Sequence, residues 1–79
     1  MLFLIDYDRG SGRIVTMQTF NDEDRTKAAD ARLKLEIELN RARKRREVVL
    51  LEAATEAALR RTHRRYFEDL AALAHLQEL

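Results

Sequence analysis

The chain of 79 residues contains no cysteine and no proline, and its charges nearly cancel at a formal net charge of +1. This length fits one domain, over residues 1–79, with a small hydrophobic core. The lack of cysteine excludes disulfides and the usual ligands of a structural zinc site. We therefore expect self-association to add stability, and we expect no metal, no cofactor and a cytoplasmic location. The short apolar start lacks the pattern of a signal peptide, and no apolar run approaches the roughly 20 residues of a membrane helix.

The N-terminal residues 1–20 have the pattern of a β-hairpin. Apolar and aromatic residues fill 1–8 and 13–20, and both glycines lie between these segments, in Arg9-Gly10-Ser11-Gly12. Glycine suits a tight reversal because such turns place residues at positive φ. The first strand is apolar on both faces, which is typical of a central strand, so we expect it to lie between two others.

The acidic segment 21–24 predicts the start of a helix over about 22–43. Asn21 or Asp22 can accept hydrogen bonds from free amides, and the acidic side chains oppose the positive end of the helix dipole. On helical geometry, Leu33 and Ile37 fall nearly opposite the main apolar stripe. This stripe comprises Ala28, Ala31, Leu35, Leu39 and Ala42. Residues 33–39 also alternate as a strand would, but the Ala, Lys, Glu and Leu content favours a helix.

Residues 48–51 are four successive apolar residues, two of them β-branched. Such a run is natural in a buried strand and awkward in an exposed helix, so we predict a strand over about 47–53, with a continued helix as the alternative. Thr55 would then cap an amphipathic helix over about 56–77. That helix would be about 33 Å long, which exceeds the cover that three short strands need. Its far end is therefore a candidate interface, comprising Leu70, Leu73, Leu76 and Leu79.

The element order ββαβα predicts an α+β fold with strand order 2-1-3. A right-handed crossover from the second strand places the third strand beside the first, which agrees with the two apolar faces of the first strand. This arrangement sets both helices on one face of the sheet. The other face would then be left to a second copy of the chain, so the sequence predicts a homodimer.

The segment from Arg41 to Arg65 carries a local net charge of +6, from nine basic residues against three glutamates. Arginine and lysine suit phosphate groups, so this segment is a candidate polyanion-binding face. The nine residues are Arg41, Arg43, Lys44, Arg45, Arg46, Arg60, Arg61, Arg64 and Arg65. An alternative is ordinary surface charge, because cations are favoured at a helix C-terminus and Glu56 and Glu68 can pair with arginines at helical spacing.

Three further patterns fail the requirements of the sites that they suggest. Asp6 and Asp8 begin like a calcium-binding loop, but the positions that should hold glycine and a bidentate glutamate hold Ser11 and Met17. The two glycines are followed by a strand, whereas a phosphate loop needs a helix. His63 lies beside Thr62 but points elsewhere on a helix, so we expect no catalytic residues and no enzyme.

The glycine-bearing hairpin, followed by Phe20-Asn21-Asp22 and an alanine-rich helix, resembles the opening of HicB-type antitoxins. The resemblance covers about half of the chain and lacks a third strand before the helix, so no residue role is carried over. The patterns together predict a noncatalytic protein-interaction module that forms a homodimer. Nucleic-acid or acidic-partner binding through the basic face is the alternative function.

Overall fold

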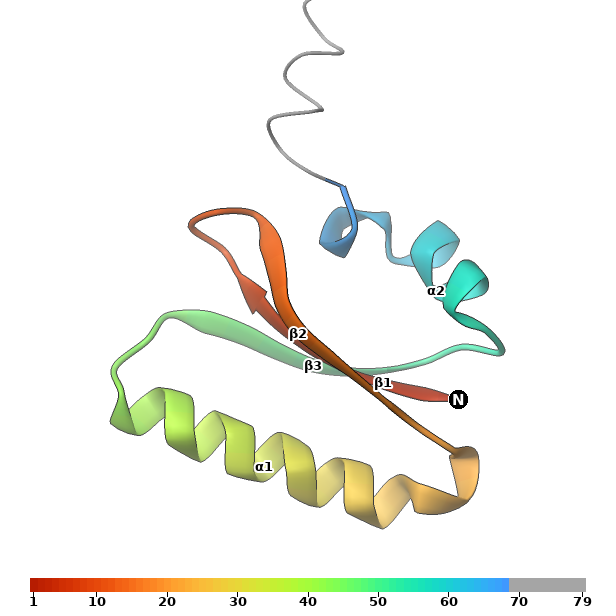
Figure 1. Cartoon of the computed structure of the whole chain (residues 1–79), viewed down its shortest axis with the longest axis horizontal. Coiled ribbons are helices and arrows are strands. Elements are labelled where there is room, and N and C mark those ends of the chain that lie inside the picture. The colour runs from red at the N-terminus through yellow and green to blue at the C-terminus, as the bar shows by residue number, and fades with distance from the viewer. Residues whose placement is uncertain (69–79) are drawn as a thin grey trace, which may run out of the picture.

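The structure, a computed structural model, describes residues 1–68 and has an α+β fold (Figure 1). Its strands are β1 (Leu2–Asp8), β2 (Arg13–Phe20) and β3 (Arg46–Glu52). Its helices are α1 (Arg25–Arg41) and α2 (Glu56–Thr62), with short 3-10 turns η1 (Asp22–Asp24) and η2 (Arg64–Tyr66). The predicted order ββαβα is confirmed, and residues 46–52 form a strand.

The three strands form one sheet in the order β2-β1-β3, as predicted. Strand β1 is antiparallel to both neighbours, and its Ile5 lies opposite Met17 on one side and Val49 on the other. Residues 2–7 of β1 are all buried, whereas β2 and β3 are only partly covered. The two apolar faces of β1 therefore correctly identified it as the central strand.

The β1–β2 turn uses Gly12 in the way that the sequence indicated, whereas Gly10 does not take a positive φ. Gly12 has φ of +70°, and its N–H donates to the carbonyl of Asp8 at 2.8 Å. The Gly10 N–H donates to a carboxylate oxygen of Asp8 at 2.9 Å. Beyond the turn, the register shifts between Asp6 and Tyr7, which leaves Val15 as the extra residue of a bulge in β2.

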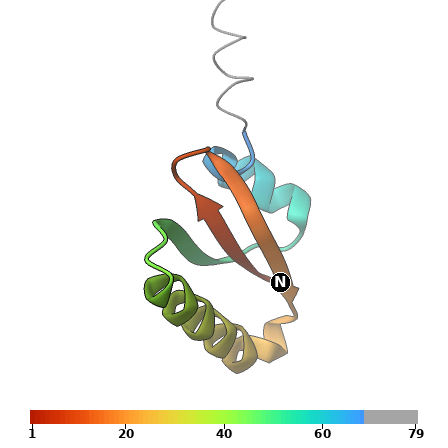
Figure 2. The same cartoon turned by 60° about the vertical axis from the view of Figure 1, so that its left-hand side comes forward.

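The prediction that both helices cover one face of the sheet is wrong. Figures 1 and 2 show α1 on one side of the sheet and α2 with η2 on the other. Phe3, Ile5 and Tyr7 face α2 and η2, so the alternation of β1 turns its remaining buried side chains toward α1. A strand that is apolar on both faces needs cover on both, and one helix on each face supplies it. The uncovered face on which the predicted homodimer depended is therefore absent from residues 1–68.

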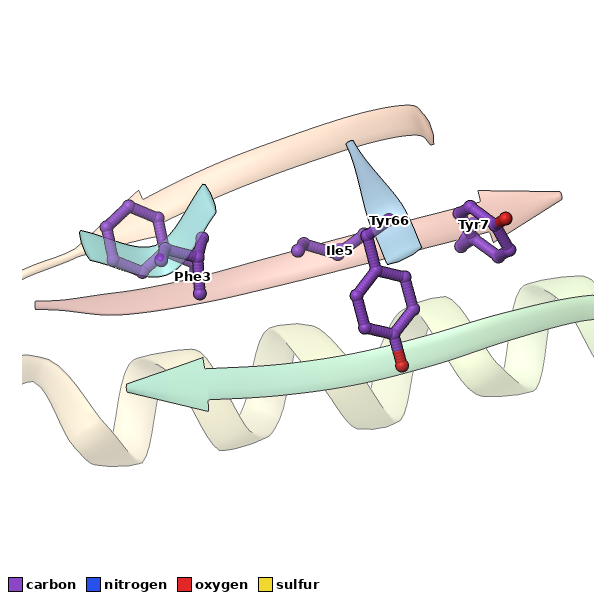
Figure 3. Close-up of a cluster of buried hydrophobic side chains, with 5 residues drawn as sticks. Phe3, Ile5, Tyr7 and Tyr66 are labelled. Atoms are coloured by element: carbon purple, nitrogen blue, oxygen red, sulfur yellow. The ribbon is translucent and has the colours of Figure 1, made fainter. Parts of the chain in front are cut away.

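The main core cluster lies between β1 and the α2–η2 segment (Figure 3). Leu59 of α2 is fully buried, and Tyr66 of η2 packs on Tyr7. The two tyrosine rings lie 5.1 Å apart between centroids and meet edge to face at 89°, a favoured aromatic geometry. Leu59 and Tyr66, both from the short α2–η2 segment, thus cover this side of the sheet.

Helix α1 starts and ends inside its predicted range of about 22–43. Neither Asn21 nor Asp24 forms a side-chain cap, and Asp22 instead accepts a hydrogen bond from the Met1 ammonium at 2.7 Å. Most of the predicted stripe faces the sheet, where Ala28 is buried and Ala31, Leu35 and Leu39 are half-buried. Ala42 lies beyond the helix end and is exposed.

The last helix is much shorter than the predicted range of 56–77. Thr55 caps it as expected, accepting the Ala58 N–H at 3.1 Å, but the helical conformation ends at Thr62. His63 has φ of −120° and ψ of 51°, and this break directs Tyr66 onto the sheet. Residues 69–79, with the predicted interface residues Leu70, Leu73, Leu76 and Leu79, lie outside the described residues. Among residues 1–68, no helix is long and apolar enough to cross a membrane.

Because α2 covers one face of the sheet, Leu59→Ala should destabilise the fold strongly. Loss of a fully buried leucine side chain leaves a cavity, and we expect the free energy of unfolding to fall by about 3 kcal/mol. Urea denaturation followed by circular dichroism measures this change. The control is Val15→Ala at the exposed bulge, where we expect a change of about 0.5 kcal/mol or less. Equal effects of the two substitutions would contradict the placement of α2.

Candidate polyanion-binding surface

Helix α1 ends in a Schellman motif, a hydrogen-bonded helix stop that usually contains glycine. The Lys44 N–H donates to the carbonyl of Leu39 at 3.0 Å, and the Arg43 N–H donates to that of Asn40 at 3.1 Å. The motif requires one residue in the left-handed backbone conformation, and Arg43 adopts it with φ of +54°. A side chain with a Cβ is disfavoured there, so the chain accepts backbone strain at a basic residue.

An open groove of about 730 Å³ lies beside this motif, at one end of the sheet. It is formed because β1 ends where β3 begins, with Asp8 opposite Arg46 across the antiparallel pair. The β1–β2 turn therefore meets the α1–β3 connection. We call this the basic groove, and its lining comprises Asp8, Arg9, Gly10, Lys44, Arg45 and Arg46.

Four basic residues at the α1 end and in the following connection carry uncompensated charge. Arg41, Arg43, Lys44 and Arg45 are exposed, and no carboxylate within residues 1–68 pairs with any of them. Lys44 and Arg45 line the basic groove directly. Closely spaced like charges repel one another, whereas the negative end of the α1 dipole attracts them.

Arg46 differs from its neighbours because its charge is already compensated. Its guanidinium donates to a carboxylate oxygen of Asp6 at 2.8 Å, and the side chains are only 17% and 5% exposed. The other Asp6 oxygen is buried without a hydrogen-bond partner among the described residues. Removing one member of such a buried pair leaves the other uncompensated, so Arg46 has a structural role at the edge of the groove.

Glu47 joins the basic groove to the opposite side of the sheet. It accepts hydrogen bonds from Arg9 at 3.0 Å and from Arg65 of η2. Burial raises the pKa of the Glu47 carboxyl, but the hydrogen bonds from Arg65 and Arg9 outweigh this effect and hold the pKa below its ordinary value. The Arg65 guanidinium also lies over the Tyr66 ring, 4.5 Å from its centroid.

The remaining basic residues of the predicted face lie on α2 and η2. Arg60 pairs with Glu56 at 3.2 Å, and Arg64 pairs with Glu68 at 2.9 Å, as helical spacing indicated. Arg60 also lies over the ring of Phe67. Because α1 and α2 cover opposite faces of the sheet, the nine basic residues do not form one continuous face. The structure brings Lys44, Arg45 and Arg46 together and separates them from Arg60, Arg61 and Arg64.

Arg9 was not among the predicted binding residues, although it lines the groove. The sequence places it in the hairpin turn, more than thirty positions before the basic segment. The signal that identifies it is the antiparallel pairing of β1 with β3, which places the end of the first strand beside the start of the third.

The other sequence patterns concern metal ligands, Thr62 and Tyr66. No group of His, Asp and Glu side chains within residues 1–68 could hold a metal ion. The Thr62 hydroxyl donates to the carbonyl of Ala58 at 3.0 Å, so it is engaged by its own helix and is not held by His63. Tyr66 is buried in the core, so its ring is not exposed to a ligand.

Comparison with known proteins gives no relative: no family model, no curated protein and no solved structure matches this chain.

Arg43→Gly should stabilise the protein by about 0.5–1 kcal/mol, because glycine adopts the left-handed conformation without a Cβ penalty. Thermal and urea denaturation measure the gain. The control is Arg45→Gly in the same connection, which removes the same charge where positive φ is not required. We expect this control to lower stability, and an equal gain from both substitutions would attribute the effect to charge alone.

Glu47→Gln should flatten the acid limb of the stability curve. The pKa of Glu47 is lowered in the folded state, so its stabilisation is complete above the ordinary glutamate pKa. That stabilisation is lost as the pH falls through the lower folded pKa. Urea midpoints measured between neutral and acidic pH should therefore fall more steeply for the natural protein than for the variant. The exposed Glu23→Gln is the control and should leave the slope unchanged.

Proposed function

We propose that the protein is a noncatalytic module that binds the phosphate backbone of nucleic acid through the basic groove and the adjoining end of α1. One observation carries this proposal: two exposed cations without ion-pair partners within residues 1–68, Lys44 and Arg45, line a groove where two segments distant in sequence meet. Lys44 and Arg45 come from the α1–β3 connection, and the β1–β2 turn adds Arg9, which is exposed and pairs with Glu47.

The composition of the groove suits phosphate groups. The guanidinium groups of Arg9 and Arg45 offer planar sets of donors that match two phosphate oxygens, and Lys44 adds a compact positive charge. Gly10 has no side chain to obstruct the approach of a ligand to this part of the wall. Strain at Arg43 supports the proposal as well, because unfavourable backbone conformations concentrate at functional positions.

We further propose that this binding is independent of base sequence. Tyr7 and Tyr66 are buried against each other, so neither ring is available to stack on a base. Helix α1 packs one face on the sheet, and its C-terminal end is the part that adjoins the basic groove. Binding should therefore depend on charge and weaken steeply with salt.

Self-association and a cytoplasmic location stay predictions beside this proposal. The argument for self-association has changed, because α2 and η2 cover the sheet face on which the sequence placed a second copy. The small core and the apolar residues exposed on α1 still favour a protein-interaction role.

The proposal is tested by removing three charges at the groove or three elsewhere. Arg43→Gln/Lys44→Gln/Arg45→Gln should weaken binding to a single-stranded oligonucleotide about tenfold or more, measured by fluorescence anisotropy at low salt. The matched control, Arg60→Gln/Arg61→Gln/Arg64→Gln, removes the same charge from the α2 side. It should change affinity by about twofold or less if the groove supplies the contacts.

Salt dependence provides the second measurement. Neutralisation of about three phosphates predicts that log K falls with log salt at a slope near −2 for a single strand. Equal losses from both triple variants would indicate attraction by net charge without a site. Absence of binding to RNA and DNA at low salt would refute the proposal. Binding of an acidic polypeptide without binding of nucleic acid would also refute it and would indicate that the groove binds an acidic protein.

A further inference from the structure

Helix α1 exposes two large apolar side chains on the face that points away from the sheet. Leu33 is 56% exposed and Ile37 is 44% exposed, and one turn of helix separates them. The opposite stripe, which includes Ala28 and Leu35, packs toward the sheet. Thus α1 is apolar on two sides, and only one of them has a partner within residues 1–68.

The outward face has the spacing of a helix–helix contact. Thr26, Asp30, Leu33, Ile37 and Asn40 recur at alternating steps of four and three residues along α1. This spacing is the seam of a paired helix, with the two apolar residues at its centre and polar residues toward its ends. Ala29 beside the seam has a small side chain, which permits close approach of a second helix.

Two charged side chains, Asp30 within the seam and Arg41 beside it, favour a second copy of α1 in the antiparallel direction. Asp30 lies three residues before Leu33, Arg41 lies four residues after Ile37, and helical geometry puts both on the same flank. Neither forms an ion pair within residues 1–68. In an antiparallel pair of identical helices centred between Leu33 and Ile37, each Asp30 lies near Arg41 of the other copy. A parallel pair would place Asp30 opposite Asp30 within the seam, which is unfavourable, and would put each Arg41 on the flank away from Asp30 of the other copy.

We propose that the outward face of α1 binds a second copy of this chain, with the two α1 helices antiparallel about a two-fold axis. The contact is isologous, so each partner supplies Leu33 and Ile37 to the centre, and at each end Asp30 of one copy pairs with Arg41 of the other. This surface replaces the sheet face, which α2 and η2 occupy. The proposal does not depend on nucleic-acid binding and is tested without nucleic acid.

Sedimentation equilibrium of the full chain, from tens to hundreds of micromolar, tests for this dimer. We expect a monomer–dimer equilibrium that Leu33→Lys/Ile37→Lys shifts to monomer throughout, while circular dichroism shows an unchanged fold because both side chains are already exposed. The control is Val15→Lys, an equally exposed apolar position on β2, which should leave association unchanged.

Charge exchange tests the antiparallel register. Asp30→Arg or Arg41→Asp alone should weaken dimerisation about fivefold by placing like charges together, and the double exchange should restore it to within about twofold. A natural chain that stays monomeric at hundreds of micromolar overturns the proposal. A dimer that survives Leu33→Lys/Ile37→Lys, or one that ignores the charge exchanges, overturns it equally, since either result places the contact elsewhere or in another register.

Discussion

The burial of β1 on both of its faces is the constraint on which the other elements depend. Phe3, Ile5 and Tyr7 need cover on one side of the sheet, and the alternate residues Leu2 and Leu4 need it on the other. A single strand with this pattern must have a neighbour along each edge and a helix over each face. The chain supplies β2, β3, α1 and the α2–η2 segment. In so small a domain, each of these elements therefore supports a large part of the core.

The central position of β1 also determines where the basic groove forms. Because β3 runs antiparallel to β1, the turn after β1 and the connection before β3 meet at the same end of the sheet. The buried Asp6 in β1 accepts a hydrogen bond from Arg46 and thereby anchors the start of β3. Arg46 is thus a fixed point between the core and the exposed cations that precede it. The groove is a consequence of strand pairing, although its charges come from a loop.

The sequence predicted those features that depend on the residue types of one segment. It predicted less well those features that depend on how distant segments pack together. Strand order followed from the two apolar faces of β1, and the cap at Thr55 followed from its residue type. The placement of α2 could not be obtained in this way, because an uninterrupted amphipathic pattern conceals the break at His63 that brings Tyr66 onto Tyr7. The end of α1 was equally hidden, since Arg43 occupies the left-handed position where glycine usually marks a stop. The position of Arg9 in the basic groove could not be predicted without knowing that the end of β1 lies beside the start of β3.

One proposed surface lies on the outward face of α1 and the other adjoins its C-terminal end, and the two have a joint geometric consequence. Helix α1 has 17 residues and is therefore about 25 Å long. An antiparallel pair of such helices places the two C-terminal ends, with Arg43 and Lys44, at opposite ends of the contact. Two basic surfaces separated by roughly one helix length would favour one extended polyanion over two small anions, because the second contact becomes intramolecular once the first has formed. Self-association would then increase affinity for long ligands without any new contact to phosphate, and affinity for a single phosphate group would be unaffected.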